Sequence, residues 1–177
     1  MPAIDATTLL CFLEQDARAP IDPNTGKPVT DAKLRIDHLI STLEKKGKTI
    51  VIPTPALSEV LVHAGSAGPE YLKILNSSSC FRIADFDQRA AVELAAMTHE
   101  ALEGGDLRAG TDATRAKLKF DRQIIAIAPV QNQTTIYSDD ADIAKLADKL
   151  DLEVVSTSSL PLPPEVLQLV FDRPEDI

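Results

Sequence analysis

The chain has 177 residues, a length typical of one compact domain. Its hydrophobic fraction of 44% is enough for a sizeable core, and because only 4% of the residues are aromatic, this core must be mostly aliphatic. Its 27 acidic and 18 basic residues leave a formal net charge of −9, which argues against a protein that binds nucleic acid through its bulk charge. No apolar run approaches the roughly 20 residues of a membrane span, and the N-terminus carries no basic leader, so we expect a cytoplasmic protein without a membrane anchor.

The first half of the chain is predicted to alternate short strands with helices. A short apolar run at the N-terminus ends at Asp5 and precedes a helix over residues 7–16. Residues 15–30 contain three prolines and an Asn-Thr-Gly turn signal, which predicts a long loop insertion. The next elements are a helix capped by Asp31 and ended by Gly47, a strand over 48–53, a helix stopped by Gly65, a short helix over 68–78 and a strand over 80–86.

The second half continues this alternation. Its predicted elements are a helix over 87–103, a helix that Thr111 or Asp112 caps and that runs to about Ala128, a strand over 134–137, a helix over 141–150 and a strand over 152–155. Short β-branched strands alternating with helices predict an α/β protein whose parallel sheet is covered on both faces. We therefore expect one domain over 1–155, followed by a Ser/Pro-rich tail over 156–177 with a short helix.

The cysteines and histidines point to no separate chemistry. Cys11 and Cys80 lie in apolar surroundings and are predicted to be buried thiols rather than a disulfide. The three histidines stand far apart without the spacing of metal ligands, so we interpret them as structural and expect no zinc site; they are His38, His63 and His99.

Four carboxylates stand in unusual sequence contexts. Asp5 and Asp140 follow the first and fourth predicted strands, while Glu59 and Asp121 lie on helices with mostly apolar neighbours. Each has an ordinary interpretation: a helix cap for Asp5 and Asp140, an exposed helix edge for Glu59, and a helical ion pair with Lys117 for Asp121. In a parallel sheet of order 3-2-1-4-5, however, strands 1 and 4 are neighbours, and all four acids can converge at the carboxyl edge where α/β proteins bind ligands.

Such a convergence would require a countercharge, because four clustered carboxylates cannot all ionise at neutral pH without one. Oxygen ligands with no His or Cys nearby favour Mg²⁺ or Mn²⁺ over zinc. One or two such ions can orient a water molecule and hold the oxygens of a phosphodiester. The pattern therefore indicates metal-dependent nuclease chemistry, in which metal ions receive the phosphate despite the acidic net charge.

The stretches IDATTLLCFLE, IVIPTPALSEVL, KFDRQIIAIA and IYSDDADIAKLA occur in an order and spacing that resemble the PIN-domain nuclease family. The resemblance is strongest to the toxin ribonucleases of type II toxin–antitoxin (VapC-type) systems and extends to about residue 150. It implies a three-layer α/β/α sandwich of about five strands, divalent-metal-dependent cleavage of RNA, frequent homodimers and inhibition by an antitoxin protein. Carried over by position, the family's acidic set is matched by Asp5, Glu59, Asp121 and Asp140, as catalytic residues and metal ligands.

Residues beside these acids depart in part from the family pattern. Ala6 follows the first Asp where Thr or Ser is common, and Thr7 takes the second place as a supporting residue. Ser138 stands where Thr is usual and keeps the supporting hydroxyl. Asp142 is either a further metal ligand or a solvated helix residue, while Asp139 is expected to be exposed.

The densest basic stretch of the chain surrounds Asp121 and comprises Arg115, Lys117, Lys119 and Arg122. These residues form either an exposed helix face or a rim that binds phosphates of the RNA substrate without reading its sequence.

Other classes of function fit less well or differ only in chemistry. A haloacid-dehalogenase-like enzyme would carry a second Asp where Thr7 stands, and a response-regulator receiver would carry its acidic pair near the N-terminus rather than at 139–140. A non-catalytic PIN module that binds RNA or a protein partner remains the alternative to a nuclease.

Overall fold

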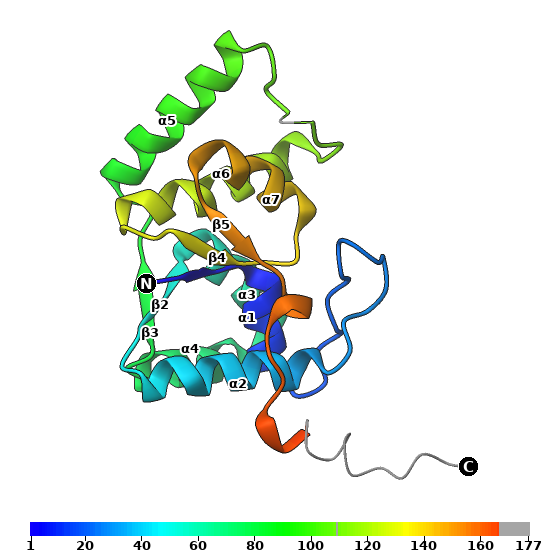
Figure 1. Cartoon of the computed structure of the whole chain (residues 1–177). Coiled ribbons are helices and arrows are strands. Elements are labelled where there is room, and N and C mark those ends of the chain that lie inside the picture. Colours follow the sequence, from blue (N-terminus) through cyan, green and yellow to red (C-terminus); the bar gives the residue numbers. More distant parts are fainter. Residues whose placement is uncertain (109, 167–177) are drawn as a thin grey trace, which may run out of the picture.

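The computed structural model describes residues 1–108 and 110–166, and within them the strands form one five-stranded parallel sheet (Figure 1). The strand order is β3-β2-β1-β4-β5, which confirms the predicted order. The strands are β1 (Ala3–Ile4), β2 (Ile50–Pro53), β3 (Phe81–Ala84), β4 (Thr135–Tyr137) and β5 (Glu153–Val155).

Helices cover both faces of this sheet and produce the three-layer architecture visible in Figure 1. The helices are α1 (Ala6–Leu13), α2 (Ala32–Lys45), α3 (Thr54–Ala64), α4 (Gly68–Ser77), α5 (Gln88–Glu103), α6 (Arg115–Val130) and α7 (Ala141–Ala147). Side chains of α1 to α4 pack on one face, and side chains of α5 to α7 pack on the other, except that Ile124 of α6 joins the core beneath α1 to α4.

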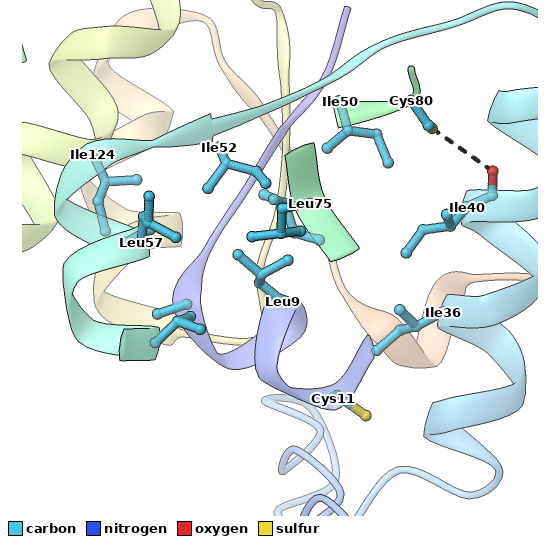
Figure 2. Close-up of a cluster of buried hydrophobic side chains, with 14 of the residues drawn as sticks. Leu9, Cys11, Ile36, Ile40, Ile50, Ile52, Leu57, Leu75, Cys80 and Ile124 are labelled. Atoms are coloured by element: carbon cyan, nitrogen blue, oxygen red, sulfur yellow. Dashed lines mark hydrogen bonds between the residues drawn. The ribbon is translucent and has the colours of Figure 1, made fainter. Parts of the chain in front are cut away.

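The two faces hold two aliphatic cores because successive strand residues point to opposite sides of the sheet. Ile50 and Ile52 of β2 contribute to the core beneath α1 to α4, whereas Val51 between them contributes to the core beneath α6 and α7. Figure 2 shows the first core, in which Cys11 and Cys80 lie among aliphatic side chains. Both cysteines are free and buried, as predicted, and the Cys80 thiol contacts the Ile40 carbonyl at 3.9 Å.

Two predicted helix caps are wrong. Asp31 has a left-handed backbone (φ 55°) and makes no side-chain cap bond, whereas a capping side chain requires an extended backbone to reach the first amides. The cap of α6 is Thr114, whose hydroxyl accepts from the Lys117 amide at 3.2 Å, rather than Thr111 or Asp112.

Residues of the predicted 15–30 loop and of the tail contribute to the first core. In the predicted 15–30 loop, Ile21 and Pro28 form an antiparallel bridge and Val29 is buried. In the tail, Leu160 joins the first core, and the Arg35 guanidinium donates to the Leu160 carbonyl. The short helix predicted for the tail falls largely on residues 167–177, which lie outside the described residues. Among the described residues, every helix is too short or too polar to cross a lipid bilayer.

Candidate metal centre

Parallel pairing of β1 with β4 brings the ends of these two strands together. Ile4 is in register with Tyr137, and the Asp5 amide donates to the Tyr137 carbonyl at 3.1 Å. Asp5 directly follows β1, and Asp140 begins helix α7 just after β4. The sheet therefore positions both acids at its carboxyl edge, as predicted from the strand order.

Asp5 is held by two hydrogen bonds in a buried position, with 2% of its surface exposed. Its Oδ1 accepts from the Thr8 amide at 2.8 Å and caps α1, while its Oδ2 accepts from the Ser138 hydroxyl at 2.5 Å. Burial raises the pKa of Asp5 to about 6, although the bonds from Ser138 and Thr8 oppose this shift. The Ser138 oxygen also accepts from the Asp140 amide at 3.0 Å, so this hydroxyl joins the two acids.

Three further carboxylates form a cluster at the same edge. One oxygen each of Asp121, Asp140 and Asp142 lies within 4.8 Å of the others. Asp121 is buried in the first half of α6, and burial raises its pKa while the bond to Lys117 opposes the rise. Asp140 caps α7 by accepting from the Asp142 amide at 2.7 Å, so capping and membership of the cluster are compatible. Asp142, which the sequence left undecided, lies within the cluster.

The ammonium group of Lys117 lies among these three carboxylates. Its Nζ is 3.0 Å from Asp121, 2.8 Å from Asp140 and 2.9 Å from Asp142. Burial alone lowers the pKa of a lysine, but the bonds to the three carboxylates hold the pKa of Lys117 above its usual range. The four-residue spacing predicts the pair with Asp121 but not the other two contacts, which depend on the packing of α6 against α7.

All four predicted acids line one pocket of about 380 Å³ together with Thr7 and Lys117. Glu59 is exposed on α3, and it lines the pocket without belonging to the three-acid cluster. Thr7 is exposed at the start of α1. The apolar side of the pocket includes Val62 and Phe120, which are 83% and 48% exposed.

The other three basic residues of the predicted rim lie elsewhere. Arg115, Lys119 and Arg122 line a second pocket between α5 and α6, because their spacing places them on a different face of α6 from Lys117 and Asp121. Arg122 is buried, and its guanidinium donates to the Leu107 carbonyl at 2.6 Å.

The expectation that Asp139 is exposed is wrong. Its carboxylate is partly buried and accepts from the Thr157 amide at 2.8 Å and from the Thr157 hydroxyl at 2.5 Å. Burial raises the pKa of Asp139, although these two bonds oppose the rise. The Asp139 carboxylate therefore holds the segment that follows β5. This contact joins two segments that are distant in the sequence, so the local sequence does not predict it.

The donor set suits a hard divalent cation. The acids contribute only carboxylate oxygens, and none of the described residues lining the pocket is His or Cys. The position of the Lys117 ammonium shows directly that these oxygens converge on a cation. The carboxylates present therefore fit a divalent metal ion.

Comparisons with known proteins identify the fold. No protein-family model matches the sequence, and no curated protein matches it significantly. A chain in the structure of VapBC2 from Rickettsia felis bound to a promoter DNA fragment is similar over 88% of this chain and 98% of its own, with 15% identity and a TM-score of 0.58.

Two more solved structures show the same similarity. A chain in the structure of FitAB bound to the IR36 DNA fragment is similar over 91% of this chain and 98% of its own, with 15% identity and a TM-score of 0.60. For DNA-bound VapBC from Salmonella typhimurium, the corresponding values are 88% and 97% coverage, 12% identity and a TM-score of 0.56. The chain therefore has the fold of the VapC-type PIN proteins that its sequence motifs resemble.

Proposed function

We propose that this chain is an endoribonuclease that hydrolyses RNA phosphodiester bonds with Mg²⁺ or Mn²⁺, and that it acts as the toxin of a cytoplasmic toxin–antitoxin pair. The observation that carries this proposal is the convergence of Asp121, Asp140 and Asp142 within 4.8 Å at the carboxyl edge, where Asp121 and Asp140 line one pocket with Asp5 and Glu59. Similarity of the fold to chains of VapBC and FitAB complexes supports it.

The side chains of this site have distinct proposed roles. Asp121, Asp140 and Asp142 hold the ion, and Asp5 completes the ligand set from the buried side, oriented by Ser138. When bound, the ion would polarise a phosphate oxygen and lower the pKa of the attacking water. We propose that Glu59, which is exposed on α3 and lines the pocket, would take the proton of that water, and that Thr7 would bind a phosphate oxygen.

The experiment that tests this proposal is RNA cleavage by the purified protein. We expect cleavage with Mn²⁺ or Mg²⁺, none with EDTA, and none with Asp5→Asn at any metal concentration that activates the wild type. Asn fits the site because its oxygen can still accept from Thr8 and its amide can donate to Ser138. Cleavage that persisted in EDTA or in the Asp5→Asn protein would refute the proposal.

One observation favours a second candidate function. Lys117 already neutralises part of the acidic cluster, which is compatible with a non-catalytic PIN module that binds RNA or a protein partner. Binding of RNA without cleavage in the same metal-dependent assay would support this candidate. In either case, the complexes with a similar fold lead us to propose an antitoxin partner and a homodimer.

The basic residues between α5 and α6 are proposed to bind phosphates away from the cleaved bond. We expect the double variant Arg115→Gln, Lys119→Gln to bind RNA more weakly. The slope of log binding constant against log salt concentration should become shallower by about 0.7 for each phosphate contact that is lost with single-stranded RNA. Binding of labelled RNA between low and high salt measures the slope, and Mn²⁺ affinity should not change. An unaltered slope would assign these residues to an exposed helix face instead.

A further inference from the structure

We infer that Lys117 is an internal competitor of the divalent ion and that it sets the metal affinity of the site. This inference rests on the proposed function, since it concerns the same three carboxylates. Lys117 Nζ lies within 3.0 Å of an oxygen of Asp121, Asp140 and Asp142. The Lys117 ammonium occupies the position among these carboxylates that a bound metal ion would require.

The position of Lys117 follows from the start of helix α6. Thr114 caps this helix and fixes its first turn, and Lys117 then lies one turn before Asp121 on the same face. Asp140 and Asp142 approach from α7, which packs against α6. The lysine therefore faces the cluster through local helix geometry, and this geometry persists whichever cation the carboxylates hold.

Lys117 can leave the cluster without unfolding its surroundings. The Lys117 side chain is 41% exposed. By contrast, the residue Arg122 on the same helix is only 8% exposed. Long lysine side chains turn their ammonium groups to water at little cost. Displacement by a divalent ion then exchanges three partly exposed ion pairs for metal–carboxylate bonds, and the three lost pairs reduce the apparent metal affinity.

The first test compares Mn²⁺ binding by the wild type and by Lys117→Gln, measured by calorimetry and by the electron paramagnetic resonance signal of free Mn²⁺. We expect Lys117→Gln to bind Mn²⁺ about tenfold more tightly, because no ammonium competes for the carboxylates. In EDTA the variant should melt at a lower temperature than the wild type, and Mn²⁺ should raise its melting temperature more. Lys119→Gln removes the same charge two residues away, on a different face of α6, and should bind Mn²⁺ like the wild type.

A second test needs no change at Lys117 and so avoids any failure of the variant to fold. An amine-reactive acetylating reagent is applied to the wild type in EDTA or in saturating Mn²⁺, and mass spectrometry gives the modification rate of each lysine. We expect Mn²⁺ to speed the modification of Lys117 several-fold and to leave Lys119 unchanged.

Equal or weaker Mn²⁺ binding by Lys117→Gln, or a Lys117 that stays protected in saturating Mn²⁺, would overturn the inference while leaving the proposed nuclease intact. Failure of both proteins to bind Mn²⁺, together with cleavage that survives EDTA, would overturn the inference and the proposed function at once.

Discussion

Asp140→Asn is expected to reduce metal-dependent RNA cleavage at least about a hundredfold. Changing a residue that only hydrogen-bonds to a metal ligand already lowers activity up to about a hundredfold, and Asp140 is proposed to be a ligand itself. Asn keeps the oxygen that accepts from the Asp142 amide at 2.7 Å and is as good a helix cap as Asp, so α7 should remain folded. What Asn removes is the negative charge that the proposed metal ligand supplies to the cluster. Initial rates of RNA cleavage at saturating Mn²⁺ measure the effect, and circular dichroism checks the fold.

The neighbouring residue provides a matched control for this change. Asp139→Asn alters the same functional group one position away, but its side chain contacts Thr157 rather than the cluster. We expect this variant to cleave RNA at close to the wild-type rate. If Asp140→Asn cleaves normally, or if both variants lose activity equally, Asp140 does not hold the ion.

Asp5→Asn is expected to stabilise the protein in EDTA at neutral pH, although it removes activity. Burial raises the pKa of Asp5 from 3.8 to about 6, so the folded protein binds this proton more tightly than the unfolded chain does. The contribution of Asp5 to stability is therefore full below pH 3.8 and is lost as the pH rises through 6. A rise from 3.8 to about 6 corresponds to about 3 kcal/mol, at roughly 1.4 kcal/mol per pKa unit.

The sign of this effect can be measured with urea unfolding of both proteins in EDTA at several pH values between 4 and 7. The free energy of unfolding of Asp5→Asn, relative to that of the wild type, should rise across this range by up to about 3 kcal/mol. Asp121 and Asp139 also have raised pKa values, but both proteins share them, so they cancel in the difference. A difference that stays constant with pH would show that Asp5 does not titrate in this range.

Addition of Mn²⁺ to the wild type and to Asp5→Asn would connect the stability of the protein with its proposed function. At neutral pH the buried carboxylate of Asp5 carries a free-energy cost that bound Mn²⁺ should offset in the wild type. Because Asn cannot supply that charge, Mn²⁺ should stabilise the wild type more than Asp5→Asn. The carboxylate thus has a proposed use in metal binding that explains why it occupies a destabilising position.

Much of the fold and part of the site could be predicted from short-range patterns. β-Branched runs and helical periodicity identified the strands and helices, and their alternation led to a parallel sheet of the observed order. The prediction that Asp5 and Asp140 lie at one sheet edge needed only their places after strands 1 and 4. Caps were less predictable: Asp31 has a suitable side chain but a left-handed backbone.

The sequence by itself therefore determined the architecture and the edge of the sheet that carries the acids, because both follow from local periodicity and from strand direction. Only the tertiary structure decided which charges from different elements meet. The packing of α6 against α7 brought Asp142 into the cluster and placed Lys117 among three carboxylates. These contacts depend on side-chain directions across two elements, and spacing along one element does not specify them.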